Sequence, residues 1–360
     1  MPQERHRLSG VVLKVQGFLP KTLWGRVAWG TAGILFLSLA FAQPAVRPRR
    51  EITLTAQRVP LSTADPKLDH VGGLRFLGGL WLKSTDEGFG GLSGLSVEEA
   101  GGELRFIAVT DQGDKLAARV VFADDRLAGA DSVTIEPLVN PEGRPVAGKV
   151  FGDAESLTRL QDGRMLVGFE RRHRIWAYEG GLAGRAQIIE TPEALLDAPS
   201  NGGLESLANW PDGRVLAITE QMKTKRANFA AFLRQDGNWT SVEWTGSAPG
   251  FEPADATVLP NGDLLVLERL WSALAPLDVR SRIMRVRGDS VKPGAVLQGE
   301  LLAELRAPLI AENFEAIAVF RGPGGATRLL VASDDNFNGA QRTLLLSFEI
   351  AEPPVPLAKP

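Results

Sequence analysis

Acidic residues recur along the chain in pairs whose spacing could assemble a cation or ligand site. In each copy an acidic residue opens an apolar run, a turn containing glycine follows, and a second apolar run ends on another acidic residue. The five copies run from Asp153 to Glu170, from Leu204 to Glu220, from Asp255 to Glu268, from Glu315 to Asp334 and Asp335, and from Ser93 to Asp111. The copy that begins at Ser93 has no acidic residue at its start. A repeat of this length places the same chemistry at equivalent positions of a repetitive fold.

The segments between these acids are short apolar runs bounded by glycine, proline, aspartate and asparagine, a pattern typical of strands. Asp162-Gly163, Asp212-Gly213 and Asn261-Gly262 are hairpin-turn signals, so each copy predicts a hairpin with an acid at both ends. The copies are anchored at positions 93, 155, 205, 255 and 315, and each interval holds two further strand candidates. After Glu268 these candidates are the runs that begin at Arg282 and at Ala295. Four strands per repeat of this length predict the blades of a β-propeller.

The last repeat contains only three strand candidates and ends with the apolar run 343–350. Segment 74–81 precedes the first copy, and we expect it to supply the missing outer strand, which would close the ring and remove open sheet edges. The prediction is therefore an all-β fold, a single propeller of five four-stranded blades closed by an N-terminal strand. Six blades are the alternative, if residues 51–83 contribute more than one strand.

Propeller geometry predicts that these acids converge. The first strand of each blade lines the central axis, and the hairpin returns the end of the second strand to the same face. Carboxylates crowded at one mouth must be protonated, paired with bases or bound to cations. Oxygen ligands without cysteine favour Ca²⁺ over Zn²⁺, with Mg²⁺ as the less favoured alternative. The candidate metal ligands are Asp153, Glu155, Glu170, Glu205, Glu220, Asp255, Glu268, Glu315, Asp334 and Asp335.

Other roles are open for the same residues. An acid at the start of an inner strand can instead bond backbone N–H groups of the next blade and only fix blade packing. Bases beside the second acids, such as Arg171 and Arg269, can neutralise those acids or hold an anionic substrate. We expect a structural role for His173, and blade packing for the tryptophans, including Trp271.

The composition excludes several classes of function. The 360 residues include no cysteine, so disulfides, cysteine-based zinc sites and thiol catalysis are excluded. No Gly-x-Ser-x-Gly elbow, P-loop or dinucleotide-binding fingerprint occurs. Without residues 1–42 the chain has 35 basic and 42 acidic residues, a net charge of about −7, which argues against nucleic acid as a partner.

The two ends of the chain differ from the repeats between them. Residues 1–42 combine a basic region with an apolar run ending in Ala40-Phe41-Ala42, and predict a secretory signal peptide or, alternatively, an uncleaved signal anchor. We expect a linker over 43–68, one propeller domain over 69–350 and a proline-rich tail over 351–360. The protein would then be a periplasmic or secreted monomer. It would be anchored in the inner membrane, facing the periplasm, if the signal stays uncleaved.

Several motifs together resemble a known family. They are Phe89-Gly-Gly-Leu-Ser-Gly-Leu, Asp153-Ala-Glu-Ser-Leu, Phe169-Glu-Arg-Arg-His-Arg-Ile-Trp, Asn201-Gly-Gly-Leu-Glu-Ser-Leu, Leu267-Glu-Arg, Asn313-Phe-Glu-Ala-Ile and Ser333-Asp-Asp-Asn-Phe-Asn. In this order, from about residue 70 to 350, they resemble the bacterial phytase-like family, described as having esterase-like activity of phytase. The resemblance implies hydrolysis of phosphate esters on a propeller. Related propeller phytases use Ca²⁺ at an acidic mouth and have six blades, whereas five repeats are counted here.

The leading hypothesis is thus an exported, Ca²⁺-dependent phosphoesterase acting on a small anionic substrate. Asp153, Glu155, Glu205, Asp255 and Glu315 would hold the cation, with Glu155 and Glu205 as the catalytic carboxylates. Arg171 and Arg269 would clamp substrate oxygens. A metal-dependent carboxylester or lactone hydrolase is the second hypothesis, and a non-catalytic periplasmic propeller that binds a ligand is the third.

Overall fold

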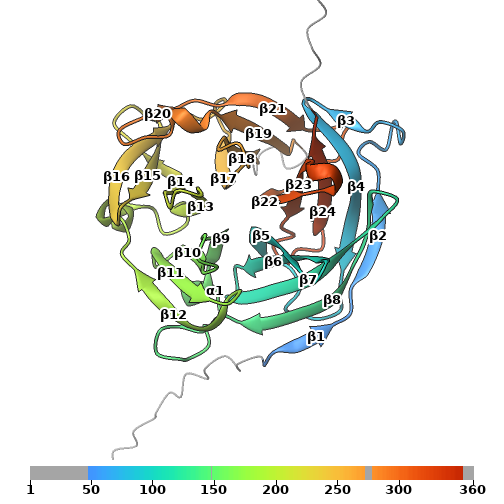
Figure 1. Cartoon of the computed structure of the whole chain (residues 1–360), viewed down its shortest axis with the longest axis horizontal. Helices are drawn as coiled ribbons and strands as arrows, with labels where there is room; N and C mark the ends of the chain where they lie inside the picture. The colour runs from blue at the N-terminus through green and yellow to red at the C-terminus, as the bar shows by residue number, and fades with distance from the viewer. Residues whose placement is uncertain (1–47, 147, 272–277, 352–360) are drawn as a thin grey trace, which may run out of the picture. The chain divides into compact units, whose positions relative to one another are not determined.

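The computed structural model describes residues 48–146, 148–271 and 278–351, which all belong to one compact unit. The predicted signal segment, 1–42, and all but the first residue of the predicted tail lie outside these residues. Within the described part of the chain, no helix is long and apolar enough to span a membrane. Five antiparallel sheets stand around a central axis like the blades of a propeller (Figure 1).

Each blade is built outward from an innermost strand. Blade 1 holds β5 (Leu92–Ala100), β6 (Glu103–Thr110), β7 (Asp114–Ala123) and β8 (Arg126–Pro137), and blade 2 holds β9 (Ala154–Arg159), β10 (Met165–Phe169), β11 (Arg174–Glu179) and β12 (Ala183–Ile189). Blade 3 holds β13 (Leu204–Asn209), β14 (Val215–Lys223), β15 (Phe229–Gln235) and β16 (Asn238–Trp244). Blade 4 holds β17 (Glu252–Val258), β18 (Leu264–Leu270), β19 (Arg280–Val286) and β21 (Glu300–Leu305). Blade 5 holds β22 (Phe314–Arg321), β23 (Thr327–Ser333), β24 (Leu344–Ile350) and β4 (Leu74–Lys83).

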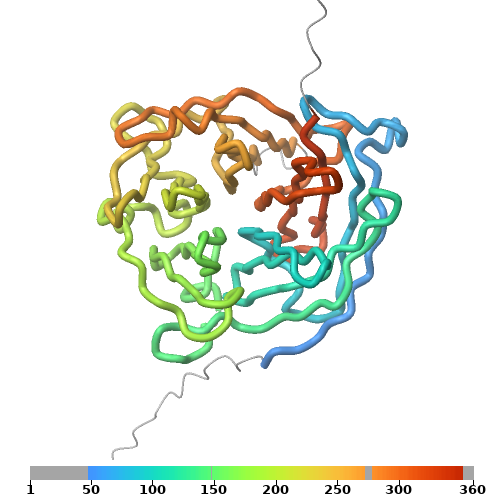
Figure 2. The backbone as a smooth tube through the Cα atoms, in the orientation of Figure 1, coloured from blue at the N-terminus to red at the C-terminus, as the bar shows by residue number. Residues whose placement is uncertain are grey.

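Ring closure follows the sequence prediction. Strand β4 pairs with β24 from the other end of the chain, from Leu74↔Ile350 to Trp81↔Leu344. Figure 2 shows this N-terminal run lying along the outside of the C-terminal strands. The five-bladed, four-stranded propeller is confirmed, and residues 51–83 do not form a sixth blade.

Two segments pair differently from what the repeat pattern suggests. The described part of the expected linker, 43–68, contributes β1 (Arg50–Ile52), which pairs with β8, and β2 (Thr55–Val59), which pairs with β4. These strands cover the outer edges of blades 1 and 5, which would otherwise present unpaired backbone groups. The run near Ala295, expected as the fourth strand of blade 4, forms the short β20 (Val296–Leu297) instead. That strand extends blade 3 through a parallel pairing with β16.

The core lies between neighbouring blades, where the alternating apolar faces of the strands meet. Phe76 and Phe348 pack with ring centroids 5.5 Å apart in the closing blade, and the indole rings of Trp210 and Trp244 are fully buried. Near the axis the inner strands need small residues. A Cβ on Gly94 of β5 would lie 2.5 Å from the backbone nitrogen of Leu157 in β9, so only glycine allows this close approach.

Candidate functional site

In each of three blades, a β-bulge in the inner strand directs one glutamate side chain toward the axis. The bulged residues are Glu155 in β9, Glu205 in β13 and Glu315 in β22, each inserted where the pairing with the second strand shifts by one residue. A bulge re-aims a side chain without ending the strand. In blade 4 the corresponding shift encloses Ala254 instead of an acid.

The ends of the second strands supply another set of side chains at the same mouth. The N–H groups of Glu170, Glu220 and Asp334 donate to the carbonyl oxygens of Asp153, Gly203 and Asn313, just ahead of or at the start of the inner strands. In blade 4 the residue at this position is Arg269, paired with Glu252. The second set therefore contains acids from several blades and one guanidinium.

Both sets line one cavity of about 450 Å³ at the axial mouth. The inner strands β5, β9, β13, β17 and β22 surround this axis in Figure 1. The charged residues in its wall are Asp111, Lys149, Glu155, Glu170, Glu205, Glu220, Glu252, Arg269, Glu315 and Asp334. The convergence predicted from the repeat is thus present.

The tightest cluster of acids belongs to blade 2. Carboxylate oxygens of Asp153, Glu155 and Glu170 lie within 4.8 Å of one another. Asp153 is fully buried, and its Oδ1 accepts no hydrogen bond from the described residues. Ser93 of blade 1, the anchor position that lacks an acid, donates its hydroxyl to Glu155 Oε2 at 2.7 Å. An all-oxygen donor set with an unsatisfied buried oxygen suits a hard cation such as Ca²⁺.

Burial and mutual repulsion disfavour ionisation of these carboxyls. Burial, followed by the charges of Asp153, Glu315 and Glu170, raises the pKa of Glu155 well above its usual range. Burial and the nearby acids also raise the pKa of Glu205 well above that range. For Glu170 burial outweighs the hydrogen bonds from the N–H groups of Gly202 and Gly203 and raises the pKa to about 7. A bound cation would relieve the same repulsion.

Two bases compensate part of the negative charge. Arg269 donates to Glu220 Oε1 at 2.6 Å and to Asn313 Oδ1 at 3.0 Å. It also lies 3.2 Å from Glu315 Oε1. Burial alone would lower the pKa of Arg269, but the charges of Glu315 and Glu220 outweigh it and raise that pKa. Arg269 therefore stays charged and joins blades 3, 4 and 5.

Lys149 is the second base, and it comes from outside the repeated hairpins. It begins α1 (Lys149–Gly152), the short helix between blades 1 and 2. Its Nζ lies 2.8 Å from Asp111 Oδ2 and 3.6 Å from Asp153 Oδ1. No feature of the repeat pointed to this residue, because it lies in a connection between blades.

Three predicted ligands lie away from the cavity and serve the backbone. Asp255 is fully buried and accepts the N–H groups of Ala256 and of Ile317 in the next blade, each at 2.8 Å. Glu268 accepts the indole N–H of Trp244 at 2.7 Å. Asp335 accepts the N–H of Gly91 at 3.2 Å and the Thr343 hydroxyl at 2.9 Å. For Asp255 the alternative role, fixing blade packing, describes its contacts.

Arg171 takes one of the two roles left open for it, whereas Trp271 differs from expectation. Arg171 holds Asp153 Oδ2 at 2.6 Å through Nε and does not line the cavity, so it orients an acid of the cluster. Trp271 was expected to pack within a blade, but it lines the cavity and is 51% exposed. It follows β18 directly, so its ring lies at the end of the strand where packing against a neighbouring blade ends.

Comparisons with known proteins support the sequence resemblance. The family model described as "Phytase-like: Esterase-like activity of phytase" matches residues 87–337. No curated protein matches the chain in sequence.

Solved structures match this chain only at low similarity. The catalytic domain of a GH62 α-L-arabinofuranosidase from Coprinopsis cinerea is 12% identical, with a TM-score of 0.48 over 84% of this chain and 99% of that one. A gluconolactonase from Xanthomonas campestris is also 12% identical, with a TM-score of 0.39 over 85% of this chain and 99% of that one. At these values neither likeness carries an argument about activity.

Proposed function

Because the chain belongs to the phytase-like family, whose model spans residues 87–337, we propose that its axial mouth hydrolyses phosphate esters of small anionic substrates with the help of Ca²⁺. The observation that carries the proposal is the oxygen cluster of Asp153, Glu155 and Glu170. Ionising all three buried carboxylates costs free energy because they repel one another, and a bound divalent cation offsets this repulsion.

Ca²⁺ suits the cluster better than Mg²⁺. Asp153 precedes β9, Glu155 lies in β9 and Glu170 follows β10. Carboxylates from such different positions give an irregular arrangement, which Ca²⁺ tolerates and octahedral Mg²⁺ does not. When bound, the cation supplies charge neutralisation at a phosphate oxygen and a lowered pKa for the attacking water. Arg171 keeps Asp153 oriented for this role through its 2.6 Å contact.

The remaining residues of the mouth would bind and orient the ester. Lys149 and Arg269 bring positive charge to the cavity wall, which attracts an anionic substrate. Glu205 faces the same cavity from the next blade and would give a proton to the leaving-group oxygen. The exposed ring of Trp271 offers an apolar surface to the alcohol part of the substrate.

The setting of the activity is part of the proposal. Residues 1–42 support export to the periplasm or beyond, and the excess of acidic residues in the rest of the chain argues against nucleic acid. We propose that the protein works there as a monomer on a small diffusible ester.

Hydrolysis assays with matched substrates test the proposal. The protein is assayed on p-nitrophenyl phosphate, p-nitrophenyl acetate and δ-valerolactone, each in Ca²⁺, in EDTA and after Ca²⁺ is restored. We expect turnover of the phosphate ester that stops in EDTA and returns with Ca²⁺. The variant Glu155→Gln should lose it, and Asp212→Asn, which changes an exposed turn acid of blade 3, should keep it.

Each of the other assay outcomes would contradict one part of the proposed function. Metal-dependent turnover of only the acetate or the lactone would assign a carboxylester or lactone hydrolase. Ca²⁺ binding without turnover of any of the three substrates would leave a ligand-binding propeller. Turnover that EDTA does not affect would remove the cation from the reaction.

A further inference from the structure

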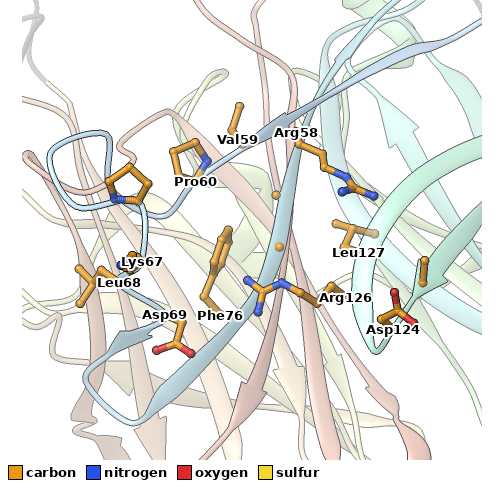
Figure 3. A pocket seen from close by; sticks show the side chains of 14 residues that line it. Arg58, Val59, Pro60, Lys67, Leu68, Asp69, Phe76, Asp124, Arg126 and Leu127 are labelled. Carbon is orange, nitrogen blue, oxygen red and sulfur yellow. The ribbon is translucent and has the colours of Figure 1, made fainter.

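A second cavity lies on the outside of the propeller, where the two ends of the chain close the ring. It has a volume of about 590 Å³ and is bounded by β2, β4 and the turn between β7 and β8 (Figure 3). This volume is in the range of cavities that hold small organic ligands. It involves none of the residues that line the axial mouth.

The wall of this cavity carries positive charge that the protein does not neutralise. Arg58 from β2, Lys67 and Arg126 from β8 line it, and among the described residues no carboxylate pairs with the side chain of any of the three. Two acids, Asp69 and Asp124, also lie in the wall, but the three bases outnumber them and Asp69 is engaged by His70 Nδ1 at 2.7 Å. Figure 3 shows the guanidinium groups of Arg58 and Arg126 on either side of β4.

Two neighbouring arginines, in contrast, are paired with carboxylates. Arg328 donates to Asp125 at 2.6 Å, and Arg75 donates to Glu349 at 2.7 Å. These two carboxylates are already used by Arg328 and Arg75, and neither lines the cavity. Arg58 and Arg126 thus remain available to an external anion.

The cavity is held in shape without a ligand. Asp124 and Asp125 adopt left-handed backbone with φ of 49° and 62°, and the almost fully buried Arg328 fixes Asp125. The turn also touches β4 directly, since a Cβ on Gly78 would lie 3.0 Å from the carbonyl oxygen of Leu127. A pre-formed site binds its ligand without an ordering cost.

The floor of the cavity is apolar. Phe76 and Leu127 both line the cavity and are almost fully buried, and Phe76 packs on Phe348. Guanidinium groups favour carboxylates and phosphates, which they can bind through two parallel hydrogen bonds. Charge at the rim and an apolar floor together select a ligand with an anionic head and an apolar body.

We propose that this outer cavity is a binding site for a small, freely diffusing organic anion, a carboxylate or phosphate attached to a ring or short alkyl group. Arg58 and Arg126 would hold the anionic head, and Phe76 with Leu127 would contact the apolar part. This inference does not depend on the reaction proposed for the axial mouth.

Calorimetric titration in EDTA with phenyl phosphate and benzoate tests the site. Benzyl alcohol, which has only the apolar part, and inorganic phosphate, which has only the anionic part, are the comparison ligands. We expect at least one of the two organic anions to bind more tightly than either comparison ligand. Arg58→Gln and Arg126→Gln should each raise its Kd about tenfold, the value of one charge-assisted hydrogen bond. Arg185→Gln, at an exposed arginine on the outer strand β12, is the matched control and should leave the Kd unchanged.

Two results would overturn the proposal. One is the absence of binding of both organic anions to the unaltered protein. The other is binding that Arg58→Gln and Arg126→Gln leave unchanged, because the anion would then lie elsewhere. A folded state with the same unfolding temperature in each variant ensures that any loss of binding is local.

Discussion

Blades 3 and 4 are built alike, but the end of the second strand brings an acid to the axial mouth in blade 3 and a guanidinium in blade 4. Their hairpins turn at Gly213 and Gly262, with φ of 87° and 90°. Counting seven residues on from each glycine gives Glu220 in blade 3 and Arg269 in blade 4. The inner strands differ in the same way, because the bulged residue is Glu205 in blade 3 and Ala254 in blade 4.

Register decides what a carboxylate does in this propeller. Asp255 lies one residue beyond the bulge, at the position that Ser206 occupies in blade 3, and so it turns into the seam between blades 4 and 5. Glu268 lies one residue before Arg269 and accepts the indole N–H of Trp244 from β16 of blade 3. The same residue type is thus a site residue in one register and a packing residue in the next.

The largest effect is expected when blade 4 receives an acid at position 269, as blade 3 has at position 220. The variant Arg269→Glu would remove the ion pairs to Glu220 and Glu315 and add a further acid to the cluster. Breaking a buried pair costs about 3–5 kcal/mol, so we expect a loss of this size in the free energy of unfolding. Denaturant titration in EDTA measures it, and Ca²⁺ should restore part of the loss by binding the folded state.

The control for Arg269→Glu is Arg285→Glu in the same blade. Arg285 pairs with Asp263 at 2.6 Å but is 35% exposed, so we expect a loss of only about 1 kcal/mol. Equal losses in the two variants would show that the mouth is no more sensitive to charge than the surface.

The second prediction concerns Asp255, the carboxylate that lies one residue beyond the bulge in blade 4. Asp255→Ala would leave the buried N–H groups of Ala256 and Ile317 without their acceptor, at a cost of about 3 kcal/mol in the free energy of unfolding. Activity per folded molecule should not change. Ser206→Ala is the matched control, since the Ser206 hydroxyl has no hydrogen-bond partner among the described residues and its loss should be nearly neutral. A loss of Ca²⁺ affinity in Asp255→Ala at full folding would contradict the assignment.

These contrasts also show what the sequence could and could not predict. The Gly163, Gly213 and Gly262 turns and the evenly spaced strands predicted the five blades and their closure, because turn chemistry is local. The bulge is a property of two paired strands, so Asp255 looked equivalent to Glu205. Counting seven residues on from the turn glycine would have placed Arg269, and not Glu268, at the axial mouth. Lys149 had no such signal, since it lies in a connection outside the repeat.

The third prediction separates function from stability within blade 3. Glu205→Gln keeps the shape of the side chain but removes its charge and its ability to transfer a proton. We expect hydrolysis to fall about 100-fold, the size found when one group that acts on the transition state is removed. Because burial and nearby acids raise the pKa of Glu205, the metal-free variant should unfold at a higher temperature than the unaltered protein. Lower stability together with full activity would contradict both parts.

The smallest expected effect is the pH dependence of the stability of the metal-free protein. The pKa of Glu170 is raised by burial to about 7 in the folded protein, against 4.5 as its ordinary value. Between these values the folded state binds a proton that the unfolded chain does not, so stability should rise as pH falls from about 7 towards 4.5. Thermal unfolding in EDTA across this range measures the rise, and Glu170→Gln should reduce it.

Saturating Ca²⁺ should reverse the sign of that dependence, because the cation binds the deprotonated carboxylates and protons then compete with it. Blade 4 provides the control. At Asp263 burial is outweighed by the Gly288 N–H group and Arg285, which lower the pKa. The contribution of Asp263 is therefore lost only at lower pH, and Asp263→Asn should leave the slope between pH 4.5 and 7 intact. An equal loss of slope in Asp263→Asn and Glu170→Gln would mean that the pH response belongs to the whole propeller and not to its axial mouth.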